Sequence, residues 1–186
     1  MKRVKDRGGF IFVEALIASG VFVVVGGAVV SLFIYGSNLW QLVITQNELR
    51  SGASTAIYQM TKDLQNATPR ASPSSPPPSL TIPTSSSITF YLPDPTNAIR
   101  TNADGSSDWD LTPIQYQYVP ASKQLSRSTP DVSKVICNNV ASVKFEDSVV
   151  NTSLPSDELK IILKVEKNTL MGIKSTTVTS IIKLRN

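Results

Sequence analysis

Hydrophobic residues follow three different patterns along this chain, one after another. Residues 10–47 form an apolar run that contains a single charged side chain, Glu14. Residues 38–67 keep apolar side chains at spacings of three and four, with charged and amide side chains between them. Over residues 88–186, short runs rich in β-branched and aromatic residues alternate apolar with polar positions. These patterns predict a membrane helix, an amphipathic helix and a β-sheet, in that order.

The apolar run is long enough to cross a membrane. About 20 apolar residues with a rise of about 1.5 Å each span the roughly 30 Å hydrocarbon core of a bilayer. Tyr35 and Trp40 follow, at the depth where amphipathic aromatic side chains favour the lipid–water boundary. A cleaved secretory signal peptide is the main alternative, but its apolar region is usually shorter and free of charge. We therefore predict one membrane-spanning segment over residues 10–37.

The amphipathic segment over residues 38–67 has a single apolar stripe. Its members recur at helical spacings and are Leu49, Ala53, Ile57, Met60 and Leu64. Because no proline occurs before Pro69, both helical segments are predicted to form one helix of nearly sixty residues, about 85 Å long. Residues 68–87 are rich in proline and serine and are predicted to end the helix in an exposed loop.

The segments that follow this loop have the composition of β-strands. The predicted strands are residues 87–92, 114–119, 123–128, 133–137, 141–147, 158–166 and 174–184. Short linkers between several of them favour antiparallel hairpins. A sheet with one apolar face needs a cover, which the helical stripe provides. The predicted fold class is therefore α+β: a long N-terminal helix packed on an antiparallel β-sheet that occupies residues 88–186.

Charge and composition exclude several classes of function. The 186 residues carry a formal net charge of +4, and residues 1–7 contribute +3 of it. A basic tail ahead of an apolar helix is a topology signal that keeps the N-terminus in the cytoplasm. It is no reason to expect direct nucleic-acid binding, which would need a basic patch on the folded domain. The chain has no histidine and one cysteine, Cys137, so intramolecular disulfides, Cys/His zinc sites and histidine-based triads are excluded. Cys137 is expected to be a small buried side chain.

One loop contains candidate ligands for a cation. Asp104, Asp108 and Asp110 lie close together around a glycine, and calcium favours oxygen ligands on flexible loops. Their spacing does not match an EF-hand, and a solvated, turn-rich loop is the favoured interpretation. The sequence contains no recognisable nucleophile–base motif and no glycine-rich phosphate loop. We expect no enzymatic activity and no cofactor, with calcium as the one candidate ion.

The N-terminal motif resembles that of a known family. The stretch KRVKDRGGFIFVEAL resembles the class III signal of type IV pilins and of the pseudopilins of type II secretion. That signal is a short basic leader, a glycine, an aromatic or apolar residue, and a glutamate five positions into the mature chain. The resemblance implies that prepilin peptidase removes residues 1–9 by cutting between Gly9 and Phe10, and then N-methylates Phe10. It also implies that Glu14 guides assembly of the helices into a filament.

Further stretches are similar to the larger minor pilins and J-type minor pseudopilins. These stretches are SGASTAIYQMTKDLQNA, IQYQYVPASKQLSRS and the terminal SIIKLRN. In those proteins a helix-borne "dL" segment precedes a tyrosine-bearing strand paired with an "L-x-R" strand. Major pilins differ from this chain, since they usually carry a proline near the position of Ser31 and often a C-terminal disulfide. Both departures point to a minor subunit.

The position of Glu14 agrees with this resemblance on physical grounds. A charged side chain at the centre of a membrane helix costs about 2.5–3.5 kcal/mol and needs a partner. Cleavage would create an α-amine at Phe10, and the amine of a neighbouring subunit can neutralise Glu14 in a filament. Subunits offset by the wrong axial step would leave both charges unpaired, so the pair would fix the register. Alternatively, Glu14 rests at the positively polarised N-terminus of an ordinary membrane anchor.

The resemblance implies a minor pilin or pseudopilin that helps to initiate or cap a type IV pilus-like or type II secretion filament. Its expected partners are prepilin peptidase, other pilins or pseudopilins, and an assembly platform in the inner membrane. The expected location is the bacterial inner membrane, crossed once, with the N-terminus in the cytoplasm and the globular domain on the periplasmic or extracytoplasmic side. The alternative is a static single-pass membrane protein that displays a binding domain.

Overall fold

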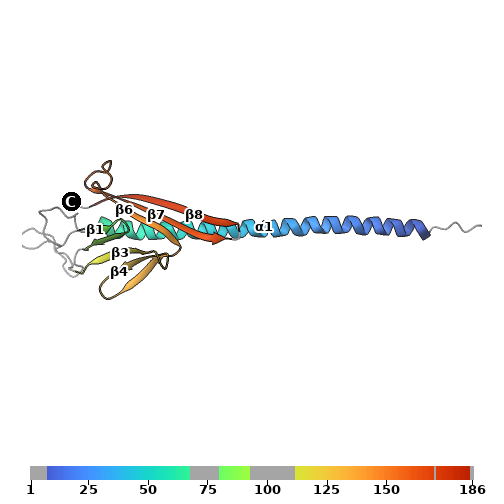
Figure 1. Ribbon diagram of the computed structural model, residues 1–186, viewed down its shortest axis with the longest axis horizontal. Helices are drawn as coiled ribbons and strands as arrows, with labels where there is room; N and C mark the ends of the chain where they lie inside the picture. The colour runs from blue at the N-terminus through green and yellow to red at the C-terminus, as the bar shows by residue number, and fades with distance from the viewer. Residues whose placement is uncertain (1–7, 68–79, 93–111, 170, 185–186) are drawn as a thin grey trace, which may run out of the picture. The chain divides into compact units, whose positions relative to one another are not determined.

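The first element, α1, is an α-helix of 58 residues, Gly8–Gln65 (Figure 1). The structure is a computed structural model that describes residues 8–67, 80–92, 112–169 and 171–184, with only the backbone described for residues 8–11. The chain divides into two compact units, Met1–Ile44 and Thr45–Asn186. The single long helix predicted from the sequence is confirmed.

In the first unit, the described residues belong to α1 alone, and most of those whose side chains are described are apolar and exposed. The most apolar window has a mean hydropathy of 2.5, and none of it is buried within the structure. Among the described residues, α1 is the one helix long and apolar enough to cross a membrane. A single N-terminal apolar helix of this kind is compatible with a membrane anchor.

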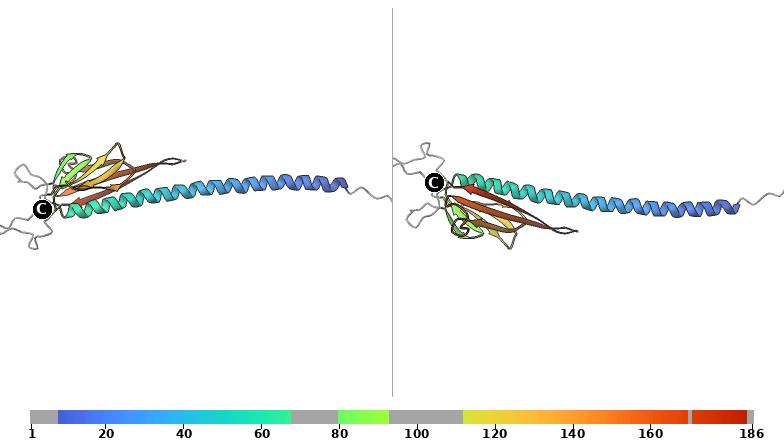
Figure 2. Two further views of the ribbon diagram at one scale, coloured as in Figure 1. Left: turned by 90° about the horizontal axis from the view of Figure 1, so that it is seen from below. Right: turned by 90° about the horizontal axis from the view of Figure 1, so that it is seen from above.

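In the second unit, α1 contributes the apolar stripe expected from the sequence. All predicted members of the stripe are buried, and Ala56 lies among them: Leu49, Ala53, Ala56, Ile57, Met60 and Leu64. Because they recur at spacings of three and four, with Ala56 and Ile57 adjacent, they occupy one face of the helix. Figures 1 and 2 show the strands gathered along this part of α1.

The strands of the described residues form two antiparallel sheets. The first contains β1 (Thr81–Thr84), β2 (Ser87–Phe90), β3 (Ile114–Val119), β4 (Gln124–Ser128) and β5 (Ser133–Cys137), in chain order. The second contains β6 (Val140–Glu146), β7 (Glu158–Thr169) and β8 (Gly172–Lys183), also in chain order. One long helix packed against antiparallel sheets confirms the predicted α+β fold class.

The prediction of a single sheet is wrong, because the strands separate into two sheets after β5. The connection to β6 is short, and Asn139 within it has a φ of +58°. Asparagine tolerates this left-handed conformation, which here turns the chain out of the first sheet instead of closing a hairpin. Backbone hydrogen bonds then join the sheets: Val140 N–H donates to the Lys123 carbonyl at 2.8 Å, and Glu166 N–H donates to the Asn139 carbonyl at 2.7 Å.

The predicted loop over residues 68–87 is wrong in its last part, where β1 forms. Thr81 and Thr84 of β1 pair with Thr89 and Ser87 of β2, with a register shift between the two pairs. Pro83 removes one backbone donor from this strand, which is tolerated because β1 lies at the edge of its sheet. The proline and serine content of residues 68–87 therefore predicts a loop where the structure has a short edge strand.

The helical stripe and the two sheets share one hydrophobic core. On β7, the alternating residues Leu159, Ile161, Leu163 and Val165 are all buried, as the period-two pattern predicts. The largest fully buried side chains include Tyr116 and Phe90 of the first sheet and Phe145 of the second. Cys137 is buried as a free thiol, which confirms its expected role as a small core residue.

Candidate functional site

The residues of the N-terminal motif lie at the start of α1. Gly9 and Phe10 belong to its first turn, where only the backbone is described. Glu14 lies about one turn further along the helix, and its side chain is exposed. The structure therefore places the predicted cleavage site and the predicted register residue on one helical segment, about a turn apart.

Glu14 differs from the other polar side chains of residues 12–34, which are serines. Ser19 Oγ donates a hydrogen bond to the Leu16 carbonyl and Ser31 Oγ donates to the Gly27 carbonyl, both at 2.8 Å. These bonds satisfy the hydroxyls inside the helix, so they need no partner from outside it. Glu14 has no hydrogen-bond or ion-pair partner among the described residues. Its exposed carboxylate is therefore open to a partner from outside the described residues.

Apolar side chains are exposed on every side of this segment. Over residues 12–34 every side chain is exposed except Gly26, which is partly buried. The largest, Phe12, Phe22 and Phe33, are 71%, 79% and 77% exposed. A helix that is apolar all round is stable only where lipid or other helices surround it. The segment therefore needs an apolar environment that the described chain does not supply.

A second polar cluster joins α1 to the first sheet. Tyr116 of β3 and Arg127 of β4 stand opposite each other in the register of that sheet. Tyr116 Oη donates to Asp63 Oδ2 of α1 at 2.7 Å, and Arg127 Nε donates to the same oxygen at 2.9 Å. One carboxylate oxygen of the helix therefore holds both members of a cross-strand pair.

Burial and charge tune this Asp63–Tyr116–Arg127 junction. Burial, followed by the hydrogen bond to Asp63 and its negative charge, raises the pKa of Tyr116 far above its ordinary value. Burial acts to lower the pKa of Arg127, but the hydrogen bond and charge of Asp63 outweigh it and raise that pKa. Tyr116 therefore stays a neutral donor and Arg127 stays a cation. Both can then donate hydrogen bonds to the Asp63 carboxylate.

No protein-family model matches this chain, and comparisons with curated proteins and with solved structures find no match. Any functional assignment therefore rests on the chain's own residues.

The sequence predicts strands over residues 114–119 and 123–128 but does not connect Tyr116 with Asp63 and Arg127. The resemblance implies that these two strands pair, and their pairing is observed. The sequence does contain a signal for this contact. Asp63 directly precedes the last stripe residue, Leu64, and a tyrosine and an arginine lie on successive strands. The contact itself depends on the helix rotation and the sheet register, which no local pattern specifies.

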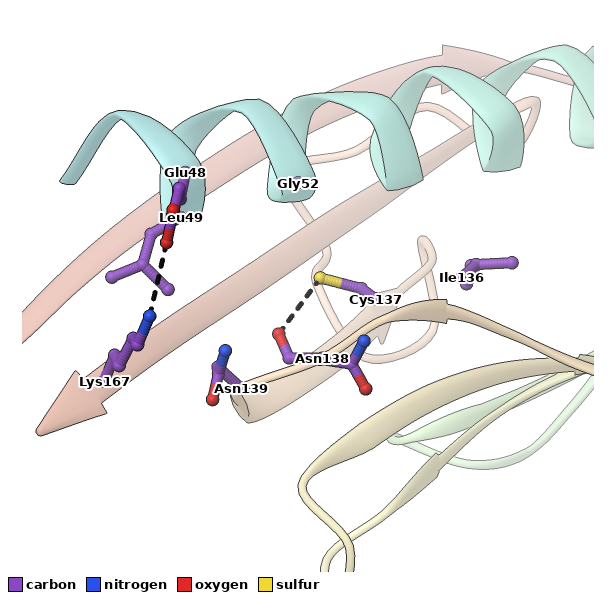
Figure 3. A pocket seen from close by; sticks show the side chains of 8 residues that line it. All are labelled: Glu48, Leu49, Gly52, Ile136, Cys137, Asn138, Asn139 and Lys167. Atoms are coloured by element: carbon purple, nitrogen blue, oxygen red, sulfur yellow. Dashed lines mark hydrogen bonds and ion pairs between the residues drawn. The ribbon is translucent and has the colours of Figure 1, made fainter. Parts of the chain in front are cut away.

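A small pocket lies beside the connection between the two sheets (Figure 3). It has a volume of about 230 Å³ and is lined by Glu48, Leu49, Gly52, Ile136, Cys137, Asn138, Asn139 and Lys167. Lys167 Nζ lies 3.2 Å from Glu48 Oε2, and the Cys137 thiol donates to the Asn138 carbonyl at 3.5 Å. Burial raises the pKa of that thiol, which favours its unreactive protonated form. The volume lies below the roughly 300–1,000 Å³ that is usual for small-molecule sites.

The candidate calcium ligands Asp104, Asp108 and Asp110 lie outside the described residues. Within the described residues, no group of three or more His, Cys, Asp or Glu side chains is arranged to hold a metal ion. Asp157, which directly precedes β7, and Glu158, its first residue, are partly buried, and Asp157 forms an ion pair with Lys183 at 3.3 Å. The functional candidates of the described chain are therefore the N-terminal helix segment and the Asp63–Tyr116–Arg127 junction.

Proposed function

We propose that this chain is a minor subunit of a filament of the type IV pilin and pseudopilin kind. In this proposal, prepilin peptidase cuts between Gly9 and Phe10 on the cytoplasmic side of the inner membrane and N-methylates Phe10. The apolar helix first anchors the subunit in the bilayer, with the folded unit on the extracytoplasmic side. The helix then leaves the bilayer and packs among those of other pilins or pseudopilins at an assembly platform.

One observation carries the proposal: Glu14 lacks a partner within the described chain although both serines of the apolar segment are satisfied within the helix. A carboxylate surrounded by apolar side chains is costly unless it is paired. The α-amine that cleavage would create at Phe10 of a neighbouring subunit is a partner of opposite charge. Since only one axial offset brings the two groups together, their pairing sets the register of assembly, as single buried polar groups do in coiled coils.

The Asp63–Tyr116–Arg127 junction supports the same proposal from the folded unit. A subunit that is drawn out of the membrane by its helix transmits force between that helix and its sheets. The junction ties α1 to β3 and β4 through charge-assisted hydrogen bonds at 2.7 and 2.9 Å. It would keep the folded unit attached to the helix during assembly.

Processing is tested by substituting Gly9 in the full chain expressed in its host. Gly9→Val should block cleavage, so that the chain keeps residues 1–9 and Phe10 carries no N-methyl group. Mass spectrometry of the purified protein measures both. A Gly9→Val chain of the same size as the unsubstituted one would rule out cleavage at this position.

Assembly is tested separately with Glu14→Ala. This chain should still be cleaved but should be lost from sheared or cross-linked filaments, because its apolar segment no longer selects a register. Glu48→Gln is the matched control, since it removes a carboxylate from the same helix at a side chain that is 60% exposed. Cleavage together with normal filament incorporation of Glu14→Ala would refute the register role. If the unsubstituted chain also keeps its leader and enters no filament, a static single-pass display protein is the better assignment.

A further inference from the structure

The two sheets have four edges, and three of them carry features that discourage pairing with another strand. β1 has only four residues, includes Pro83 and has a register shift. β5 has five residues and is paired to β4 with a register shift. β6 has a register shift against β7, and its backbone is engaged with the other sheet, since Phe145 N–H donates to the Ser85 carbonyl at 2.8 Å. Short length, proline, bulges and cover are the usual means of protecting a sheet edge.

The fourth edge, β8, has none of these protections. It is 12 residues long and pairs with β7 residue by residue from Gly172 to Lys183, with no register shift (Figure 1). No other strand of the described chain pairs with it. On such a strand, every second residue directs its backbone N–H and C=O away from the neighbouring strand. Within the part of the chain that the structure describes, a row of donors and acceptors without a partner strand therefore runs along β8.

The side chains of β8 add a chemical preference to this free edge. Residues 175–182 are uncharged and mostly β-branched, and they contain no proline or glycine. Ile173 and Ile181 are 67% and 57% exposed, on the side of the strand that does not face the core. This composition favours an extended segment of similar character beside it.

The two charged residues of β8 are both lysines, Lys174 and Lys183. Lys183 is 3.3 Å from Asp157, but Lys174 has no ion-pair partner among the described residues. Lys174 also stands opposite another lysine, Lys167 of β7, whose ammonium group is paired with Glu48. Like charges directly opposite each other on a sheet are destabilising, so a carboxylate beside Lys174 would be favourable.

We propose that β8 accepts an extended strand from a partner polypeptide. The partner strand has an uncharged, β-branched stretch beside residues 175–182 and a carboxylate next to Lys174. Backbone hydrogen bonds to the free edge supply the affinity, and the lysine supplies the preference for an acidic partner. The proposal stands on the geometry of the second sheet and does not depend on the function proposed above.

A second copy of β8 is a poorer occupant of this edge. Parallel pairing in register would place each lysine opposite its own counterpart. Antiparallel pairing over the full length would place Lys174 of one copy opposite or diagonal to Lys183 of the other. In each arrangement, positive charges meet without a carboxylate between them. The charge pattern therefore selects a different, acidic strand.

The test uses two labelled synthetic peptides and the full chain in detergent micelles. Each peptide has about ten residues, alternating Thr and Val, the length of a typical strand. One peptide ends in aspartates and the other in lysines. Fluorescence anisotropy measures binding, and amide hydrogen exchange locates it. The aspartate peptide should bind at least about tenfold more tightly and should slow exchange at alternate amides of β8, because only those amides face the free edge.

Charge reversal at the edge provides the control. Lys174→Glu should reverse the preference between the two peptides, whereas Lys134→Glu, an exposed lysine on the short edge strand β5, should leave it unchanged. Unchanged exchange in β7 shows that each variant is folded. The proposal is overturned if neither peptide binds, if binding protects another strand, or if β8 is already protected in a chain that sediments as a dimer. The last result would identify a second copy as the occupant.

Discussion

The two parts of α1 show how one helix can serve two different surroundings. Over residues 12–34 apolar side chains are exposed on every side, and none of the most apolar window is buried. Over residues 49–64 the apolar residues form a single stripe that is buried against the sheets, while the remaining faces are polar. The distribution of apolar residues around the helix, rather than their number, separates a segment that needs an external partner from one that has its partner in the same chain.

Polar side chains show the same contrast. In the apolar segment Glu14 has no partner among the described residues, while in the packed segment Asp63 accepts two hydrogen bonds at 2.7 and 2.9 Å. A carboxylate whose partners lie in the same chain stabilises the fold. A carboxylate without such partners in the described chain is left open to partners from outside it. The predictions below test this difference between the two segments.

The largest effect is expected from removing a core side chain of the packed segment. Leu64→Ala should lower the free energy of unfolding of the second unit by about 2–5 kcal/mol, because a fully buried leucine leaves a cavity. Leu32→Ala, at an exposed position of the apolar segment, should change it by less than about 0.5 kcal/mol. Amide hydrogen exchange of β7 in the full chain measures both values. Equal losses of unfolding free energy from the two substitutions would contradict the division of α1 into a packed segment and an exposed apolar segment.

The next effect concerns the Asp63–Tyr116–Arg127 junction. A double-mutant cycle with Asp63→Asn and Arg127→Gln should give a coupling of about 1.5–3 kcal/mol, since the bond involves charged, partly buried groups whose side chains are 18% and 25% exposed. The same cycle on the exposed pair Glu48 and Lys167 should give less than about 1 kcal/mol. Denaturant unfolding monitored in the second unit checks both. Similar coupling energies for the two pairs would mean that partial burial does not strengthen the interaction between Asp63 and Arg127.

The raised pKa of Tyr116 predicts a loss of stability at alkaline pH. The unfolded tyrosine has an ordinary pKa of 10.0, whereas the folded one is higher. Above pH 10.0 the unfolded chain therefore releases a proton that the folded chain keeps, so stability declines as pH rises. Tyr116→Phe should be less stable at neutral pH but should show a shallower alkaline decline. Unfolding measured on both sides of that pH gives the two slopes, and parallel slopes would exclude Tyr116 as the group responsible.

The smallest effect is expected from a glycine in the packed segment. A Cβ added at Gly52 meets no heavy atom within 4 Å, and the position lies inside α1. Gly52→Ala should therefore stabilise the second unit by about 0.5–1 kcal/mol through helix propensity. Gly27→Ala, which also meets no atom within 4 Å but lies in the apolar segment, should leave that unit unchanged. Thermal unfolding measures the stability of both variants. A Gly52→Ala variant that is less stable than the unsubstituted chain would contradict the prediction.

The sequence predicts the elements of this fold better than their contacts. The stripe from Leu49 to Leu64 and the alternation on β7 are repeated local patterns, so each is visible without the rest of the molecule. The separation of the sheets is not visible, because a short connection containing asparagine usually predicts a hairpin, and only the tertiary surroundings of Asn139 decide otherwise. Strand β1 is hidden because its single proline is acceptable only at an edge, and position within a sheet is not a local property.

The candidate sites divide in the same way. Gly9, Phe10 and Glu14 lie within a stretch of six residues, so a local motif is enough to predict them as a site. The meeting of Asp63, Tyr116 and Arg127 joins residues from a helix and two strands, with separations of 53 and 64 positions along the chain. Such a contact follows from register and helix rotation together, so it emerges only when the fold is known.

The core shared by α1 and the second sheet also has a consequence for biosynthesis. The hydroxyls of Thr61 and Ser180 are 3.5 Å apart, although 119 positions separate them in the chain. Both sheets are meanders of neighbouring strands and can begin to form locally, but β7 and β8, which cover the helical stripe, are synthesised long after it. Until then the stripe is an apolar surface without its cover. A chaperone that shields apolar helices would therefore be expected to act on residues 49–64 before β7 and β8 are synthesised.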